Sequence, residues 1–99
     1  MALKIEWTAN ALEDYRQVVD YLHKEWPFNV VADFVNNLEK RVDNLSSFPF
    51  IGIASLKDPS IRSIVITKHN KLYYRTSPDK IKILDIFDTR QSSGKNKYD

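Results

Sequence analysis

The sequence predicts an α+β domain in which a small antiparallel sheet of about four strands carries an N-terminal α-hairpin on one face. Two observations lead to this prediction. Apolar residues recur at helical spacing through two adjacent segments near the N-terminus, and they alternate with polar residues in short runs after residue 60. The expected order is therefore β-α-α-β-β-β, because helices precede a set of hairpin-linked strands. The second face of the sheet is expected to stay open.

A change of period marks the first strand and the first helix. LKIEW (3–7) alternates like a strand, and Thr8 is the expected N-cap of the helix that follows. Pro27 disfavours helical geometry at Trp26, so the helix should end there. The apolar stripe of this helix consists of Ala11, Leu12, Tyr15, Val18, Val19, Leu22 and Trp26.

A second helix follows almost at once, with Asn29 as its expected N-cap. The link between the helices is too short for a crossover, so the two should pack antiparallel. We expect Tyr15, Trp26 and Phe34 to be core aromatics. The apolar stripe of the second helix is Val31, Phe34, Val35, Leu38, Val42 and Leu45.

The rest of the chain reads as one loop and three strands. SSFPFIGIASLKDPS (46–60) has turn residues throughout and is the main loop. KIKILDIF (80–87) has apolar residues at both odd and even positions, which predicts a central strand with both faces partly covered. The three strands are expected at about 61–67, 71–76 and 80–88. The turns between them are placed around His69–Asn70 and Pro78–Asp79.

Length and composition limit the class of protein. A chain of 99 residues has room for one domain, which we expect to span 1–91, with 92–99 as a short polar tail. The sequence has no cysteine and two histidines, so we expect neither a disulfide framework nor a metal site, and no cofactor. No apolar run has the length of a signal peptide or a membrane span, which favours a cytoplasmic protein.

Charge is distributed unevenly along the chain. Residues 1–60 hold six Lys or Arg against nine Asp or Glu, a sum of −3, and residues 61–99 hold nine against four, a sum of +5. One interpretation is a localised anion-binding surface. The other is that solvated strand edges carry lysine.

The segment IRSIVITKHNKLYYR (61–75) contains four permanent cations. With a turn of two or four residues, Lys68 lies opposite Lys71 and Ile64 lies opposite Arg75. Because cross-strand partners share a face, this register gathers the cations on the open face, and a three-residue turn scatters them. Like charges repel, so such a cluster suggests a phosphate site. The gathered residues are Arg62, Lys68, Lys71, Tyr73 and Arg75.

The ordered set of motifs resembles the RelE/ParE superfamily, the toxin halves of bacterial type II toxin–antitoxin pairs. The resemblance covers nearly all of residues 3–91 and rests on the helical pattern up to LEKRVDNL, then FPFIG, IRSIVITKHNKLYYR and KIKILDIFDTRQ. It implies a small antiparallel sheet with a helical hairpin on one face. In this superfamily the RelE branch enters the ribosomal A site and cleaves mRNA, whereas the ParE branch poisons DNA gyrase without nuclease chemistry.

The resemblance also implies site residues. Arg62 matches a basic position on the first strand of the hairpin, and Lys71 matches a functional cation at the start of the next strand. Arg90, in FDTRQ, matches the basic residue that closes the last strand. RelE-type enzymes often add a tyrosine or histidine near the C-terminus, and Tyr98 is the candidate here. The segment around it, QSSGKNKYD, has no helical pattern to position that side chain.

RNA cleavage through the neighbouring 2′-hydroxyl needs a base, a cation for the phosphate and an acid for the leaving oxygen. Arginine forks suit phosphate oxygens, which makes Arg62, Arg75 and Arg90 candidates. The base is Lys71 crowded by cations, or His69, and the acid is Tyr98. The RNA- or phosphate-binding candidates are Lys68, His69, Tyr73 and Arg75. The plainer alternatives are a turn role for His69, packing for Tyr73 and an ion pair with Asp85 or Asp88 for Arg90.

Three functions remain open. The first expectation is a toxin that cleaves mRNA on the ribosome without a metal. The second is a toxin that blocks DNA gyrase, and the third is a non-toxic RNA-binding relative. Either toxin implies a cognate antitoxin, which we expect to lay an acidic or amphipathic segment over the basic face or the helical groove.

Overall fold

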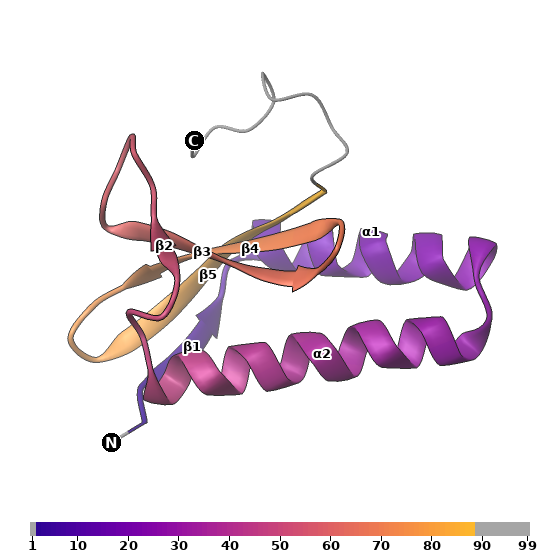
Figure 1. The fold of residues 1–99 in the computed structure, drawn as a ribbon, viewed down its shortest axis with the longest axis horizontal. Helices are drawn as coiled ribbons and strands as arrows, with labels where there is room; N and C mark the ends of the chain where they lie inside the picture. Colours follow the sequence, from indigo (N-terminus) through magenta and orange to yellow (C-terminus); the bar gives the residue numbers. More distant parts are fainter. Residues whose placement is uncertain (1, 89–99) are drawn as a thin grey trace.

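Five strands form one mixed sheet in the computed structural model, which describes residues 2–88 (Figure 1). The helices are α1 (Ala9–Glu25) and α2 (Phe28–Ser47). The strands are β1 (Lys4–Trp7), β2 (Ile53–Ala54), β3 (Ile61–Thr67), β4 (Asn70–Thr76) and β5 (Lys80–Asp88). The α+β class and the position of the helices before the hairpin-linked strands are confirmed. The additional strand, β2, is a two-residue segment within the expected loop.

The spatial order of the strands is β1-β5-β4-β3-β2. The expected central position of β5 is confirmed, because it lies between β1 and β4. The expectation of a wholly antiparallel sheet is wrong at one edge, where β1 pairs parallel with β5 and Ile5 lies opposite Ile81. Parallel neighbours need a long crossover connection, and the α-hairpin with the strands after it supplies one.

The first helix begins and ends where the sequence indicated. The Thr8 hydroxyl accepts a hydrogen bond from the Ala11 amide at 3.1 Å and donates one to the Ile83 carbonyl at 2.9 Å. Thr8 therefore caps α1 and also fixes its start against β5. Trp26, before Pro27, has an extended backbone with φ −136° and ψ 154°, and the helix stops at Glu25.

The second helix begins two residues earlier than expected. Pro27 occupies the N-cap position with φ −60°, and Phe28 is the first helical residue. Asn29 is therefore inside the helix, and its prediction as the cap is wrong. The proline ring holds φ near the helical value, and the Pro27 carbonyl accepts a hydrogen bond from the Val30 amide at 3.0 Å, while no side chain caps this helix.

The α-hairpin covers one face of the sheet, and the core lies between these two layers (Figure 1). Tyr15 stacks on Trp7 with ring centroids 5.7 Å apart and meets Phe34 edge-on at 6.2 Å. Trp26 was expected in this core, but it is 53% exposed. The reason is its place at the tip of the α-hairpin, which extends past the β3–β4 turn (Figure 1). The main core residues are Ala11, Phe34, Leu38, Val42, Leu45, Ile66, Leu72, Tyr74, Ile81, Ile83 and Ile86.

Candidate functional site

The β3–β4 hairpin has a different register from the expected one. Its turn is Lys68–His69, and a β-bulge at Ile66 then shifts the pairing so that Arg62 lies opposite Tyr74. Had the ladder continued from the turn without the bulge, Arg62 would have paired with Arg75 on one face. One extra residue reverses the alternation of β3 relative to β4. The expectation that this hairpin gathers its four cations on one face is therefore wrong.

The new register divides the cations between the two faces and the turn. Arg62 shares the face of Tyr74, which belongs to the core under the helices. Lys71 and Arg75 lie on the open face, opposite Val65 and Ile61 on β3. Lys68 lies in the turn with His69. Only two of the four hairpin cations therefore share a surface.

Arg62 holds the loop between α2 and β2. Its Nη1 atom donates hydrogen bonds to the Gly52 carbonyl at 2.8 Å and the Phe50 carbonyl at 3.3 Å. Its guanidinium carbon also lies 5.2 Å from the centroid of the Phe50 ring, within range of a cation–π contact. These contacts give Arg62 a structural role, and its role in catalysis stays a prediction.

Tyr74 fixes the same loop from the core. Its hydroxyl donates to the Pro49 carbonyl at 2.9 Å and accepts from the Gly52 amide at 3.0 Å. Burial raises the pKa of Tyr74, while the Gly52 amide and the charge of Arg62 act in the opposite direction. Tyr74 and Arg62 together attach the loop to β3 and β4.

Tyr73 occupies the open-face side of β4 but is fully buried. It lies between Ser63 on β3 and Asp85 on β5. Its ring has no exposed surface on which a nucleobase could stack, so the packing alternative fits the structure better than RNA binding.

Arg75 forms an ion pair with Asp58 of the loop before β3, with Nη2 and Oδ2 3.2 Å apart. The Asp58 carboxylate also accepts hydrogen bonds from the Ser60 hydroxyl at 2.7 Å and the Ser60 amide at 3.1 Å. These hydrogen bonds from Ser60, and then the charge of Arg75, lower the pKa of Asp58 below its ordinary value of 3.8. Arg75 therefore already has a carboxylate partner.

The lowered pKa of Asp58 makes its contribution to stability depend on pH. A depressed pKa in the folded state stabilises the protein above the unfolded-state value, and this stabilisation is lost as the pH falls through the folded-state value. We expect Asp58→Asn to be less stable than the wild type by a constant margin between pH 5 and 7, and the margin to shrink below about pH 4.

Urea unfolding at several pH values measures this margin. Arg75→Met is the control, because it leaves both Ser60 hydrogen bonds in place and should keep most of the pH dependence. A stability difference between Asp58→Asn and the wild type that does not vary from pH 3 to 7 would contradict the assignment.

The sequence reasoning missed two cations on the open face, Lys80 and Lys82. Parallel pairing places Glu6 of β1 opposite Lys82, and the Glu6 carboxylate lies 3.1 Å from the Lys80 ammonium and 3.9 Å from that of Lys82. Contact with the Lys80 ammonium lowers the pKa of Glu6. The alternation of Lys80 and Lys82 in KIKI was a usable signal, because residues two apart on a strand share a face.

The remaining predicted residues lie apart from this face or outside the described residues. Lys68 and His69 line a cleft of roughly 370 Å³ that also contacts Tyr21 and Trp26 at the tip of the α-hairpin. Arg90 and Tyr98 fall outside residues 2–88. Within those residues no group of three or more His, Cys, Asp or Glu side chains is placed to hold a metal ion. In the same range, no helix has the length and apolar character needed to cross a bilayer.

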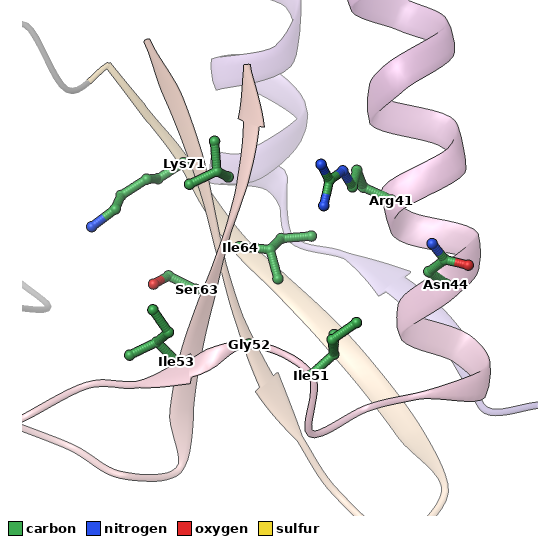
Figure 2. Close-up of a pocket in the computed structure, with 9 residues that line it drawn as sticks. Arg41, Asn44, Ile51, Gly52, Ile53, Ser63, Ile64 and Lys71 are labelled. Carbon is green, nitrogen blue, oxygen red and sulfur yellow. The ribbon is translucent and has the colours of Figure 1, made fainter. Parts of the chain in front are cut away.

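A groove of roughly 220 Å³ follows the outer edge of β3 beside α2 (Figure 2). Its apolar residues come from the loop and from β3. Its two charged residues among those described are Arg41 of α2 and Lys71 of β4, both basic. The full lining is Arg41, Asn44, Ile51, Gly52, Ile53, Ser63, Ile64, Val65 and Lys71.

A comparison with known protein families identifies the family of this chain. The model of the ParE toxin of the type II toxin–antitoxin system parDE matches residues 5–93. The chain belongs to the ParE toxin family. It is therefore a toxin of a type II toxin–antitoxin system, and the RelE/ParE resemblance is confirmed. Membership of the family implies a cognate antitoxin.

Solved structures with the same fold include other toxins of this kind. The chromosomal ParDE system from P. aeruginosa matches with a TM-score of 0.74 at 18% identity, covering 90% of this chain and 98% of that chain. The YoeB/ParE toxin from Agrobacterium tumefaciens has a TM-score of 0.62 at 18% sequence identity, and the match covers 87% of this chain and 98% of that chain. The YoeB dimer from Staphylococcus aureus has a TM-score of 0.63 at 18% sequence identity, and the match covers 88% of this chain and 97% of that chain. Curated proteins contain no significant match.

Proposed function

We propose that this ParE-family toxin acts by binding DNA gyrase and not by cleaving mRNA. The observation that carries the proposal is the register of the β3–β4 hairpin. It places Arg62 and Lys71, the first two candidates for nuclease chemistry, on opposite faces of the sheet. The match to the ParE model supports the same choice, because the ParE branch was expected to act on gyrase.

Cleavage through a 2′-hydroxyl needs its base, its phosphate-binding cation and its acid around one phosphorus atom. Arg62 instead donates to loop carbonyls, and Arg75 is paired with Asp58. Tyr73 is buried and cannot stack on a base. The described residues thus supply separated cations and loop contacts, which is a better basis for protein binding than for general acid–base catalysis.

A second candidate is the mRNA endonuclease, and one observation favours it. Lys71, Arg75, Lys80 and Lys82 share the open face of the sheet. A row of cations on a sheet is a suitable track for a phosphate backbone. The two candidates differ in what the toxin does to its target, so one pair of assays separates them.

The decisive experiment applies the purified toxin, with its fold checked by circular dichroism, to gyrase supercoiling and to a translating extract. We expect supercoiling to be inhibited at a stoichiometric excess of toxin, and transcripts in the extract to keep intact ends. Mapped cuts in mRNA together with normal supercoiling would establish the second candidate instead. Normal supercoiling with intact transcripts would also reject the proposal.

A further inference from the structure

We propose that the cleft at the tip of the α-hairpin is the interface of a homodimer, with a second copy of this toxin as its occupant. This tip cleft lies between the end of the α-hairpin and the β3–β4 turn (Figure 1). Its helix wall includes Tyr21, Trp26 and Asp33, and its turn wall includes Lys68 and His69. The inference goes beyond the proposed function and does not depend on the target of the toxin.

Two aromatic side chains of the helix wall are half exposed in a single chain. Tyr21 is 47% exposed and Trp26 is 53% exposed, whereas Phe34, which also lines the cleft, is buried. The place of Trp26 is fixed, because its extended backbone ends α1 and its amide donates to the Leu22 carbonyl at 2.8 Å. Partly exposed aromatic side chains on a fixed backbone are typical of the centre of a protein interface. They favour a protein as the occupant.

The permanent charges of the tip cleft are divided between its two walls. Asp33 of α2 is the one carboxylate in the described lining, and Lys68 of the turn is the one permanent cation. Both residues are exposed, and within residues 2–88 neither of them forms an ion pair. Each cleft therefore has an acidic wall without a cation and a basic wall without an anion.

A two-fold axis that runs along the cleft brings unlike walls together. In such an interface every contact occurs twice, so Asp33 of each copy meets Lys68 of the other. An arrangement with like walls together would place Asp33 against Asp33 and Lys68 against Lys68, which opposes association. Charge thus selects one orientation, and in that orientation Tyr21 and Trp26 of each copy face the turn of the other.

A partner whose charges have a single sign fits the tip cleft less well. An acidic segment would be attracted by Lys68 and repelled by Asp33, and a basic segment would meet the reverse. The cleft requires a partner that carries both signs in a matching arrangement. A second copy of the chain meets this requirement by symmetry.

Sedimentation equilibrium of the purified toxin tests the proposal. We expect a dimer with a dissociation constant in the micromolar range, because the tip is a small part of the surface. Lys68→Asp and Asp33→Lys should each weaken self-association by at least about tenfold, since each change converts two attractive contacts into two repulsive ones. Lys40→Asp is the matched control, because it makes the same charge change at an exposed position of α2 outside the cleft, and it should alter the affinity by less than about twofold.

A mixture of the two charge variants gives a sharper test. At the two positions of the pair, Lys68→Asp has two carboxylates and Asp33→Lys has two ammonium groups, so each variant repels itself. One copy of each variant restores both opposite pairs. We expect neither variant to self-associate at concentrations where the wild type is dimeric, and the mixture to form a heterodimer with an affinity within about threefold of the wild type. Circular dichroism of each variant checks that it is folded.

The fluorescence of Trp26 reports which surface is covered. The sequence contains two tryptophans, so Trp7→Phe leaves Trp26 as the reporter. We expect its emission to shift to shorter wavelength as the toxin concentration rises, because the ring leaves water in the dimer. The same shift should be absent when Lys68→Asp is added to this background.

A wild type that stays monomeric at about 300 µM would overturn the proposal. A dimer that persists in folded Lys68→Asp, or a mixture of the two variants that does not associate, would also overturn it, because the interface would then lie elsewhere. A monomeric wild type whose Trp26→Ser variant no longer inhibits gyrase would assign the tip to the target instead. The sedimentation and fluorescence measurements involve no gyrase, so a failure of the supercoiling assay would reject the proposed function alone.

Discussion

Gly52→Ala is expected to destabilise the toxin by about 2–4 kcal/mol, because a methyl group at this position has no room. The added Cβ would lie 2.6 Å from the Tyr74 hydroxyl oxygen and 2.8 Å from the Ser63 carbonyl oxygen. The Tyr74 ring is fully buried, and the Ser63 oxygen belongs to the backbone of β3. The loop must therefore move away and lose the hydrogen bond between the Gly52 amide and Tyr74.

Thermal unfolding measures this effect, and we expect the Tm to fall by at least about 8 °C for a domain of this size. Ile53→Ala is the control, because it changes the neighbouring residue, whose side chain is largely exposed, and should alter stability by less than about 0.5 kcal/mol. In a Tyr74→Phe background the same Gly52→Ala change should cost less, since one of the two closest atoms is gone. Equal stability of Gly52→Ala and the wild type would show that the loop is not held as described.

The helical half of the fold was predictable because its signals are local. The apolar stripes, the Thr8 cap and the stop before Pro27 each depend on residues within a few positions of one another. The pairing of β1 with β5 joins the two ends of the domain, and no short window of sequence records it. That pairing brings Glu6 beside Lys80 and Lys82, and this ion pair could not be predicted without it.

Two bulges determine which side chains share a face of the sheet. Ile81, Ile83 and Ile86 all face the helices. Ile83 follows Ile81 by two residues, as expected in a strand, but Ile86 follows Ile83 by three. The extra residue is Leu84, which pairs with no residue of β4. Its carbonyl accepts a hydrogen bond from the Thr8 hydroxyl at 3.3 Å. The sequence pattern was interpreted as partial cover of both faces, and β5 indeed has no exposed residue, but the bulge also contributes to this pattern.

The bulge at Ile66 has a larger consequence, because it determines which surface Arg62 occupies. From the sequence, the pairing of β3 with β4 could be predicted only from the number of residues in the turn. That number does not reveal an extra residue further along β3. The hydrogen-bond partners of Arg62 could not be predicted either, because they are the backbone carbonyls of Phe50 and Gly52. Every residue has a backbone carbonyl, so the sequence does not distinguish these two. The site was thus predictable as a set of basic residues and not as an arrangement.

Leu38→Ala should have the largest effect on stability, a loss of about 3–5 kcal/mol. Leu38 is 1% exposed at the centre of α2 and belongs to the main core. Its removal loses buried apolar surface and leaves a cavity that the surrounding helices and sheet can close only in part. Because a domain of this size is stable by about 5–15 kcal/mol, the loss is a large share of the total.

Leu12→Ala is the matched comparison, because Leu12 lines the same cleft between α1 and α2 as Leu38 but is 53% exposed. Both changes replace leucine with alanine inside a helix, so helix propensity contributes almost equally and cancels. The difference between the two variants in urea unfolding therefore measures burial, and we expect Leu12→Ala to cost less than about 1 kcal/mol. Similar losses in both variants would mean that α2 does not pack on the sheet through Leu38.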